Sequence, residues 1–464
     1  MRPELVPSDE DIFSVVEQVF ARGVRRPAYP ADLWTEQFCL QRFRDLAMEN
    51  VRSEPFEVSY WEPRRWSLAA WSDGDGASSA VDLPCFPLPY TVPVEGLTAR
   101  LVAFDDGAPD AAEGNVALLN AGIAHLPYRG LLTAATAWYD PDGTFDGYTQ
   151  ILPFSTGRQQ AIDSTIASGA SAFIASLAGY PSDCCEQYVP YRGAVLPVPG
   201  VWVSGLDGDR LARMLAEGPV SVRLTVETDT HTAESNNVLG ELPGDDDELV
   251  VVGSHHDGPW ASAVEDASGV ALVLAQAEYW ARVPQEERPH RMLFILQGGH
   301  MAGGAGHKAF GALHAGEMAR MVLAVHLEHA ALECVEGDGR LVATGRPEPR
   351  WWFTSRSPRL EASVLAAIEA ERLARSVIVP PTVFGAWPPT DGSGFYLAGV
   401  PLVSFLAAPF YLFDSQDTLD KVDRDNLAAI TRAAIRIIES TRGETAKSMR
   451  EAVIPRSVLV QKHW

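Results

Sequence analysis

The sequence has few cysteines, too few basic residues to balance its acids, and no long apolar run. It holds five cysteines in 464 residues, an odd number with Cys184 next to Cys185, which excludes a disulfide framework. Lys and Arg total 37 against 61 Asp and Glu, a formal net charge of -24. This excess excludes nucleic acid and the anionic membrane surface as partners, because both bind concentrated Lys and Arg. No apolar run approaches the ~18 residues of a spanning helix, and the N-terminus lacks a targeting pattern, so we expect a cytoplasmic protein.

The residues that are present predict a folded α/β protein, since 46% of them are hydrophobic. Residues 8 to 50 have helical periodicity, and a Trp-rich strand follows. Strand and helix patterns between Thr98 and Thr228 indicate a small separate α/β unit. We therefore expect a main domain formed by residues 1–97 and 229–464, with residues 98–228 inserted.

From Asn236 onward, continuous apolar strands alternate with amphipathic helices. This order predicts a mainly parallel central sheet flanked by helices on both faces. Sheets of this kind bind ligands just beyond the carboxyl ends of their strands. The polar residues that end each apolar run are therefore the candidates for a functional site.

Histidines and acids gather at these predicted strand ends. Imidazole and carboxylate groups are the ligands that Zn²⁺ and similar cations prefer. Their convergence predicts a metal site, formed from His255, His256, Asp257, Glu265, Asp266, His300, His326, Glu328 and His329. Successive strand residues face opposite sides, so His255 and His256 cannot both face one metal from a regular strand, and neither can Glu328 and His329.

Four segments carry a family resemblance. They are NNVLGELPG, GSHHDGPWASAVEDASGVALVLA, TDGSGFYLAGVPLVSF and DSQDTLDKVDRDNL. In this order they resemble the zinc aminopeptidase and glutamate carboxypeptidase II family, metallopeptidase family twenty-eight. The resemblance implies a phosphorylase/hydrolase-like zinc peptidase fold, and the inserted unit is similar to the protease-associated domain that many members carry.

The resemblance also implies roles for individual residues. His255 falls on the histidine of the first metal, and Asp257 on the carboxylate that supports it. Glu328 falls on the acidic ligand of the same metal. Counting back from Ser268 and Gly269, Glu265 falls on the bridging acid and Asp266 on the neighbouring asparagine of the family, but counting does not settle which of the two acids binds the metal.

The second metal position of the family is altered here. Gly298, Gly299, His300 and Met301 stand where the family has Gly-Ala-Glu-Glu, and Phe413 stands where it has a histidine ligand. Met and Phe are poor Zn²⁺ ligands, so we expect one Zn²⁺ ion, or another divalent metal. His300 is the candidate general base, because imidazole titrates near neutral pH. If the sequence is aligned with the family motif one residue further along, His300 falls on a metal ligand instead.

Other polar residues are candidates for substrate binding. Asp391 lies in a glycine-rich loop, and Tyr396 could donate a hydrogen bond to a substrate carbonyl. His256 and His329 could join them if the backbone departs from regular strand geometry.

Three functions fit these observations. The first is metal-dependent hydrolysis of a peptide or amide bond in a small peptide or amino-acid-derived substrate, and we favour it. The second is a tailoring or acyl-transfer reaction on an amino-acid-like metabolite. The third is a non-catalytic binding relative. A homo-oligomer is compatible with all three.

Overall fold

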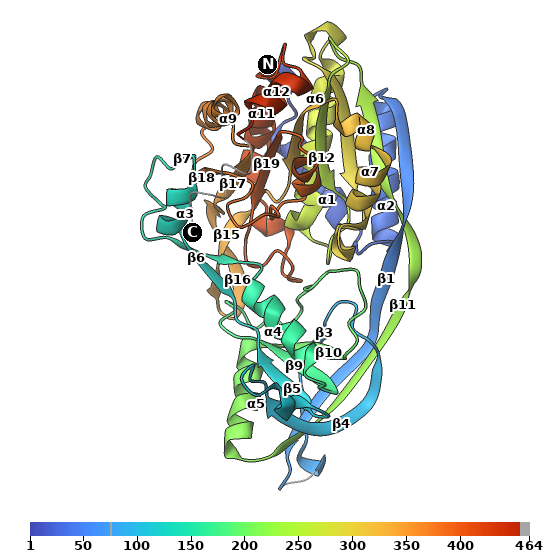
Figure 1. Cartoon of the computed structure of the whole chain (residues 1–464), viewed down its shortest axis with the longest axis vertical. Helices are drawn as coiled ribbons and strands as arrows, with labels where there is room; N and C mark the ends of the chain where they lie inside the picture. Colours follow the sequence, from blue (N-terminus) through green and yellow to red (C-terminus); the bar gives the residue numbers. More distant parts are fainter. Residues whose placement is uncertain (75–76, 455–464) are drawn as a thin grey trace.

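A single mixed sheet of 15 strands runs through the molecule (Figure 1). The structure is a computed structural model that describes residues 1–74 and 77–454. Thirteen strands follow the order β3-β10-β9-β5-β4-β11-β13-β12-β14-β19-β17-β18-β7, and β1 and β2 pair beside this path. Within the described ranges, no helix combines the length and the apolar character that crossing a membrane requires.

Four parallel strands form the centre of the upper part of the sheet. In spatial order they are β13 (Arg291–Gln297), β12 (Leu249–His255), β14 (Met321–Leu327) and β19 (Leu402–Ala407). All residues of β12, β14 and β19 are buried, as expected for strands covered on both faces.

Helices cover both faces of these strands. Val250 and Val252 of β12 share a core with α6 (Gly269–Arg282) and α11 (Leu427–Glu439). Their neighbours Leu249 and Val251 point the other way, where Phe310 of α7 (Ala305–Leu313) and Phe395 of α10 (Ser393–Leu397) pack on them. The α/β class expected from the alternating pattern is confirmed.

The flanks of the sheet are antiparallel. On one side β17 (Arg350–Thr354) pairs antiparallel with β19, and β18 (Ser376–Val379) carries the antiparallel edge strand β7 (Ala137–Tyr139). On the other side β11 (Val220–Leu242) pairs antiparallel with β13. The expected parallel arrangement therefore describes the centre, whereas the whole sheet is mixed.

A long antiparallel ribbon joins the upper and lower parts of the molecule. It consists of β1 (Glu49–Ser72) and β11, which lie along one side in Figure 1. The lower part has a core of its own, where Leu211 packs against strand residues such as Ile174 and Val203. It contains β3 (Phe86–Pro87), β4 (Val94–Ala103), β5 (Val116–Asn120), β9 (Ala172–Leu177), β10 (Gly200–Ser204), α4 (Thr156–Ala167) and α5 (Gly205–Glu217).

The sequence-based domain limits fall inside strands. Residue 98 lies in β4 and residue 228 in β11, so the sheet continues through both positions. β7, which lies between these limits in the chain, joins the far edge of the upper sheet. The inserted domain therefore stays a prediction.

The remaining elements surround this frame. The helices expected over residues 8 to 50 are present, and α1 begins with a capping box at Ser8. The bounds are α1 (Asp9–Phe20), α2 (Pro30–Asp45), β2 (Val81–Leu83), β6 (Ala124–Pro127), α3 (Tyr128–Ala134), β8 (Thr149–Leu152), α8 (Ala315–Met318), β15 (Leu332–Gly337), β16 (Arg340–Pro347), α9 (Pro358–Ala370) and α12 (Ala446–Ala452).

Candidate metal centre

A cluster of histidines and carboxylates lies at the carboxyl ends of the central strands. His255 is the last residue of β12, His300 follows β13, and His329 follows β14. Glu265 lies in the segment before α6, and Asp391 precedes α10. The parallel strands end at one edge of the sheet, which brings together residues that are far apart in the chain.

Three fully buried side chains form the inner part of the cluster. His255 Nε2 lies 3.5 Å from Glu265 Oε1, and His329 Nε2 lies 2.6 Å from Glu265 Oε2. One ligand atom from each of the three side chains fits within 4.8 Å of the other two. Glu265 therefore lies between two imidazoles, a spacing that suits a shared cation.

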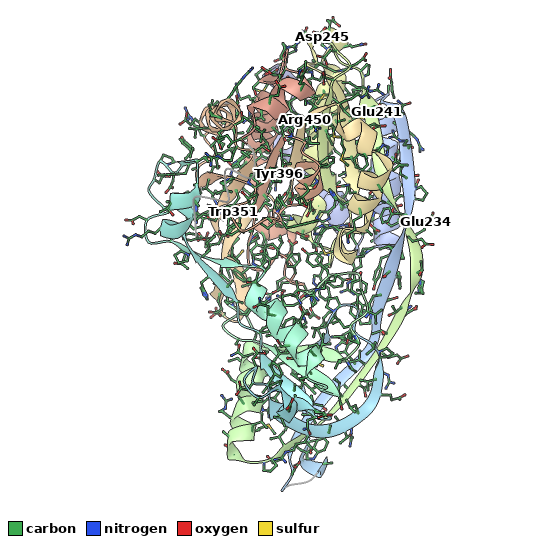
Figure 2. The ribbon with its side chains drawn as sticks, viewed as in Figure 1. Glu234, Glu241, Asp245, Trp351, Tyr396 and Arg450 are labelled. Atoms are coloured by element: carbon green, nitrogen blue, oxygen red, sulfur yellow. The ribbon has the colours of Figure 1, made fainter. Side chains whose placement is uncertain are left out.

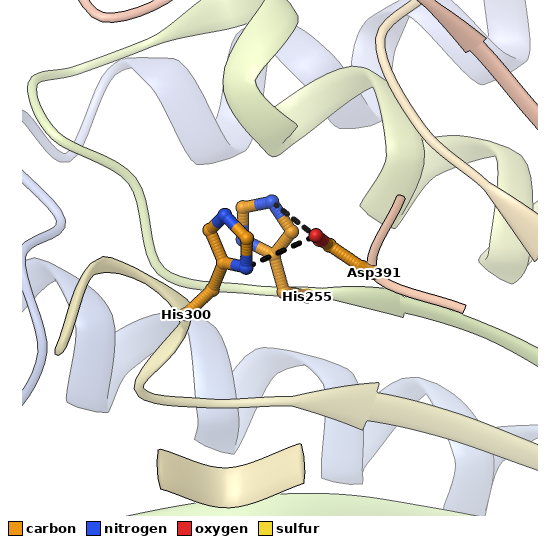
Figure 3. Close-up of side chains that lie close together, drawn as sticks. All are labelled: His255, His300 and Asp391. Carbon is orange, nitrogen blue, oxygen red and sulfur yellow. Dashed lines mark ion pairs between the residues drawn. The ribbon is translucent and has the colours of Figure 1, made fainter. Parts of the chain in front are cut away.

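The outer part of the cluster is shown in Figure 3. Asp391 Oδ2 lies 3.3 Å from His255 Nε2, and Asp391 Oδ1 lies 3.1 Å from His300 Nδ1. The His255 and His300 rings stack with centroids 4.3 Å apart. The Nε2 atom of His300 lies 3.8 Å from Glu265 Oε1, so this ring faces both acids.

The cluster contains buried polar atoms that lack a hydrogen-bond partner among the described residues. They belong to four side chains and comprise His255 Nε2, both Glu265 carboxylate oxygens, His329 Nε2 and Asp391 Oδ2. The ion pair between His329 and Glu265 compensates charge, but a buried atom that has lost its water without gaining a hydrogen bond is costly. Nitrogen and carboxylate oxygen donors that converge in this way fit Zn²⁺.

Asp257 positions its neighbours instead of joining the cluster. Its two carboxylate oxygens accept hydrogen bonds from the backbone N–H groups of His300, at 3.1 Å, and Met301, at 2.7 Å. Its backbone carbonyl lies 2.9 Å from His255 Nδ1, which leaves only Nε2 of that ring for a ligand. Support of this kind fixes ring orientation.

The structure distinguishes the two neighbouring acids. Asp266 Oδ1 accepts hydrogen bonds from the backbone N–H groups of Gly269 and His329, and Asp266 Oδ2 accepts one from the Ser254 hydroxyl. Asp266 is thus occupied by hydrogen bonds, whereas neither oxygen of Glu265 has a hydrogen-bond partner among the described residues and both face imidazoles. Of the two, Glu265 has the atoms available for a metal.

Glu328 forms part of the wall of the site. Its Oε1 atom lies 2.8 Å from His326 Nδ1 and accepts hydrogen bonds from the hydroxyls of Thr390, at 2.8 Å, and Ser404, at 3.1 Å. The sequence-based assignment of Glu328 as a ligand stays a prediction. The neighbouring residue His329 has its Nε2 atom 2.6 Å from Glu265 Oε2.

Two further sequence-predicted residues, His256 and Tyr396, are not brought into the cluster. His256 is fully buried, with Nδ1 2.7 Å from Asp32 Oδ1 and Nε2 2.8 Å from the Asn236 carbonyl. Tyr396, labelled in Figure 2, packs in an apolar cluster with Phe310 and Phe395. The sequence placed both residues near the site, but neither side chain lines the cavity.

Two contributors were not found from the sequence. Buried Arg25 donates hydrogen bonds to the backbone carbonyls of His256, at 3.3 Å, and Ser262, at 2.9 Å, which fixes the segment that carries Glu265. Tyr191 packs its ring 5.2 Å from the ring of His300. Neither residue lies near a strand end, so no pattern in the sequence marks it.

The charges of the cluster compensate one another. Burial would raise the pKa of Glu265, but His329 and His255 hold it below its usual range. Burial would lower the pKa of His329, but Glu265 raises it to about 10. Burial and the neighbouring His255 lower the pKa of His300 to about 4, while burial and Glu328 raise the pKa of Asp391 well above its usual range.

A cavity of about 500 Å³ opens at the cluster. Its walls are mainly apolar and aromatic, and they combine residues of the upper and lower parts of the molecule. Phe154, Tyr191 and Phe413 form one wall, in which the Tyr191 and Phe413 rings lie 5.0 Å apart. A mainly apolar cavity with a few converging polar groups is the usual form of a small-molecule site.

Comparison with known proteins finds a matching family model and similar folds. Residues 237–438 match the family model described as Peptidase family M28. A search of the curated proteins found no match.

Among solved structures, a peptidase M28 precursor from Shewanella amazonensis is similar with a TM-score of 0.70 and 21% identity, over 93% of each chain. A zinc aminopeptidase from Bacillus subtilis is similar with a TM-score of 0.66 and 16% identity, over 97% of this chain and 99% of that one. An aminopeptidase from an Aneurinibacillus species has a TM-score of 0.63 and 18% identity, over 97% and 94%. Identities this low show a shared fold. Residues 237–438 therefore form a peptidase family M28 domain, and the chain is a metallopeptidase-like hydrolase.

Proposed function

We propose that this protein hydrolyses a peptide or amide bond in a small substrate with one divalent metal ion, Zn²⁺. In this proposal His255, Glu265 and His329 hold the ion, and Asp391 completes the set. The observation that carries the proposal is the convergence of unpartnered buried atoms from these four side chains. When bound, Zn²⁺ polarises the carbonyl of the bond to be cleaved.

His300 is suited to act as the general base. With a pKa of about 4, its imidazole is neutral near pH 7 and has a free lone pair. Asp391 lies at its Nδ1 atom, which orients the ring and leaves Nε2 facing Glu265. His300 can therefore take the proton that water loses on attack and return it to the leaving amine. Asp257 holds the backbone of His300 in place.

The cavity supports a small substrate. Its volume of about 500 Å³ accommodates a short peptide or an amino-acid derivative.

We further propose that residues 98–228 form an inserted protease-associated-like domain, because Phe154 and Tyr191 from this range line the cavity. All five cysteines are free, which agrees with the cytoplasmic location expected from the sequence.

Metal analysis of the purified protein tests the proposal. We expect about one Zn²⁺ per chain in the parent, and loss of the ion in Glu265→Gln and His329→Ala. His314→Gln is the matched control, because His314 is a buried histidine that pairs with Glu54 outside the cluster. Its metal content should equal that of the parent.

A folded parent protein that takes up no Zn²⁺ would contradict the proposal and favour the non-catalytic binding function. Metal that survives both Glu265→Gln and His329→Ala would contradict the proposed ligand set. Metal bound without hydrolysis of any amino-acid amide or dipeptide would favour the tailoring function.

A further inference from the structure

One arginine in the wall of the cavity is buried and pairs with no acid among the described residues. Arg158 is 6% exposed and is the third residue of α4, the helix that lies where the lower part meets the upper part in Figure 1. It lines the same cavity as His255, Glu265 and His300. A positive charge in the first turn of a helix is also unfavourable, because the helix dipole is positive there.

The guanidinium of Arg158 makes no hydrogen bond and no ion pair with the residues that the structure describes. Its Nε atom is buried and unpartnered. Its Cζ atom lies over the ring of Trp202, 5.8 Å from the ring centroid. A weak contact at this distance does not replace the water that the buried Nε–H group has lost.

Arg158 differs in this respect from the other buried arginines. Each of them donates to a carboxylate or to backbone carbonyls. Arg350 pairs with Asp423 and Arg375 with Glu333, while the remaining three bind carbonyls, namely Arg25, Arg26 and Arg288. The fold therefore satisfies buried arginines wherever they have a structural role, and Arg158 is the exception among those described.

It also differs from the other cations of the cavity. Arg192 forms two hydrogen bonds with the carboxylate of Asp163, at 2.9 and 2.8 Å. Lys308 is exposed, so water can solvate its ammonium. Within the described part of the cavity wall, Arg158 is therefore the buried cation that has no acid beside it.

We propose that Arg158 binds a carboxylate group of the substrate, so that the site acts on short peptides or amides that carry a free carboxylate. Arginine suits this role, because its planar fork matches the two oxygens of a carboxylate. The N-terminal end of α4, with Ser155, Arg158 and Gln159 in the cavity wall, adds the positive end of the helix dipole. This inference rests on the proposed hydrolysis, because it names the substrate class of the same site.

Binding of a simple probe tests the inference without relying on hydrolysis. The probe is 4-phenylbutyrate, and its neutral counterpart is 4-phenylbutyramide, both measured by calorimetry on the metal-loaded and on the EDTA-treated protein. We expect Arg158→Met to weaken binding of the carboxylate roughly 10- to 100-fold, with little change for the amide. The effect should persist after EDTA treatment, since Arg158 is not among the proposed metal ligands.

Stability separates this role from a structural one. If Arg158 serves to bind a ligand and has no structural role, Arg158→Met should raise the midpoint of thermal unfolding or leave it unchanged. The reason is that the substitution removes an unpaired buried charge. Arg192→Gln is the matched control, and its carboxylate binding should equal that of the parent. A lower midpoint for Arg158→Met with unchanged carboxylate binding would overturn the inference.

Kinetics distinguish failure of the inference from failure of the proposed function. For a dipeptide with a free terminal carboxylate, Arg158→Met should raise KM at least tenfold, while the amidated dipeptide keeps its KM. Equal KM changes for both substrates would overturn the inference and leave hydrolysis intact. If no substrate is hydrolysed but the carboxylate probe still depends on Arg158, the proposed function fails and the binding site stands.

Discussion

His300 occupies the position that decides which chemistry the site can perform. It is 20% exposed on the cavity side, whereas His255, Glu265 and His329 are buried behind it. A group that exchanges protons with water needs such access, and a group that holds a metal does not. We therefore separate His300 from the proposed ligands.

Replacement of His300 tests this separation. We expect His300→Ala to lower kcat for amino-acid amides by roughly 10²- to 10⁴-fold, the usual contribution of a general base, with metal content and KM close to the parent values. The measurement combines steady-state kinetics with metal analysis. His307→Ala serves as the control, since His307 also lines the cavity but has Gln297 as its partner. Parent-like kcat would show that His300 is not the base, and loss of metal would make it a ligand.

The sequence indicated most of the residues that meet in the cluster, but not which of them are available to a metal and which are held by hydrogen bonds. His255, Glu265 and His300 are recognisable because they follow buried strands or precede a helix. The choice between Glu265 and Asp266 depends on Ser254, Gly269 and His329, whose N–H and O–H groups occupy Asp266. Those contacts exist only after distant strands have paired, so residue spacing could not predict them.

At the level of elements, buried apolar runs predicted the central strands and their covering helices. The same reasoning missed the length of β1 and β11, which have 24 and 23 residues. Over most of this length the two strands are extended because they pair with each other. It also missed β7, which forms a strand because it pairs with β18. Elements that depend on a distant partner have only a weak local signal.

A buried hydrogen-bond chain attaches β8 and α3 to the main sheet. The Trp351 indole N–H donates to Tyr128, whose hydroxyl donates to Gln150, and Gln150 Nε2 donates to Glu348 Oε1 at 2.7 Å. Glu348 is 4% exposed, and burial together with the nearby Glu333 carboxylate raises its pKa to about 8. This carboxyl is therefore held neutral in the folded protein.

The raised pKa makes the stability of this attachment depend on pH. Because the folded pKa of about 8 exceeds the unfolded value of 4.5, the contribution of Glu348 is complete below pH 4.5 and is lost as the pH rises through about 8. Glu348→Gln keeps an acceptor for Gln150 but cannot ionise. We expect the free energy of unfolding of this variant, measured in urea, to exceed that of the parent by an amount that grows between pH 6 and pH 8 and levels off by pH 9.

Glu336→Gln provides the control, because Glu336 is exposed on β15. Its difference from the parent should not vary with pH. A constant difference for Glu348→Gln over the same range would contradict the assignment of a neutral buried carboxyl.

At the scale of the whole molecule, the site joins segments that are distant in the chain. Its proposed ligands come from positions 255, 265, 329 and 391, and the carboxyl ends of the central strands bring them together. Without a cation, two carboxylates and two imidazoles keep buried atoms that have no hydrogen-bond partner among the described residues, although Glu265 and His329 form an ion pair. An ion bound to all four would satisfy these atoms only in the folded state, so metal binding and folding should be coupled.

This coupling gives a quantitative expectation for the intact chain. At a free Zn²⁺ concentration 100 times the Kd, set with a metal buffer, the free energy of unfolding should rise by about 2.7 kcal/mol, and by about 1.4 kcal/mol for each further tenfold increase. His329→Ala removes one of the four proposed ligands, so its unfolding should respond only at much higher Zn²⁺. An equal response of parent and variant would place the stabilising ion elsewhere, whereas a response confined to the parent would show that one ion at this edge of the sheet holds the four segments together.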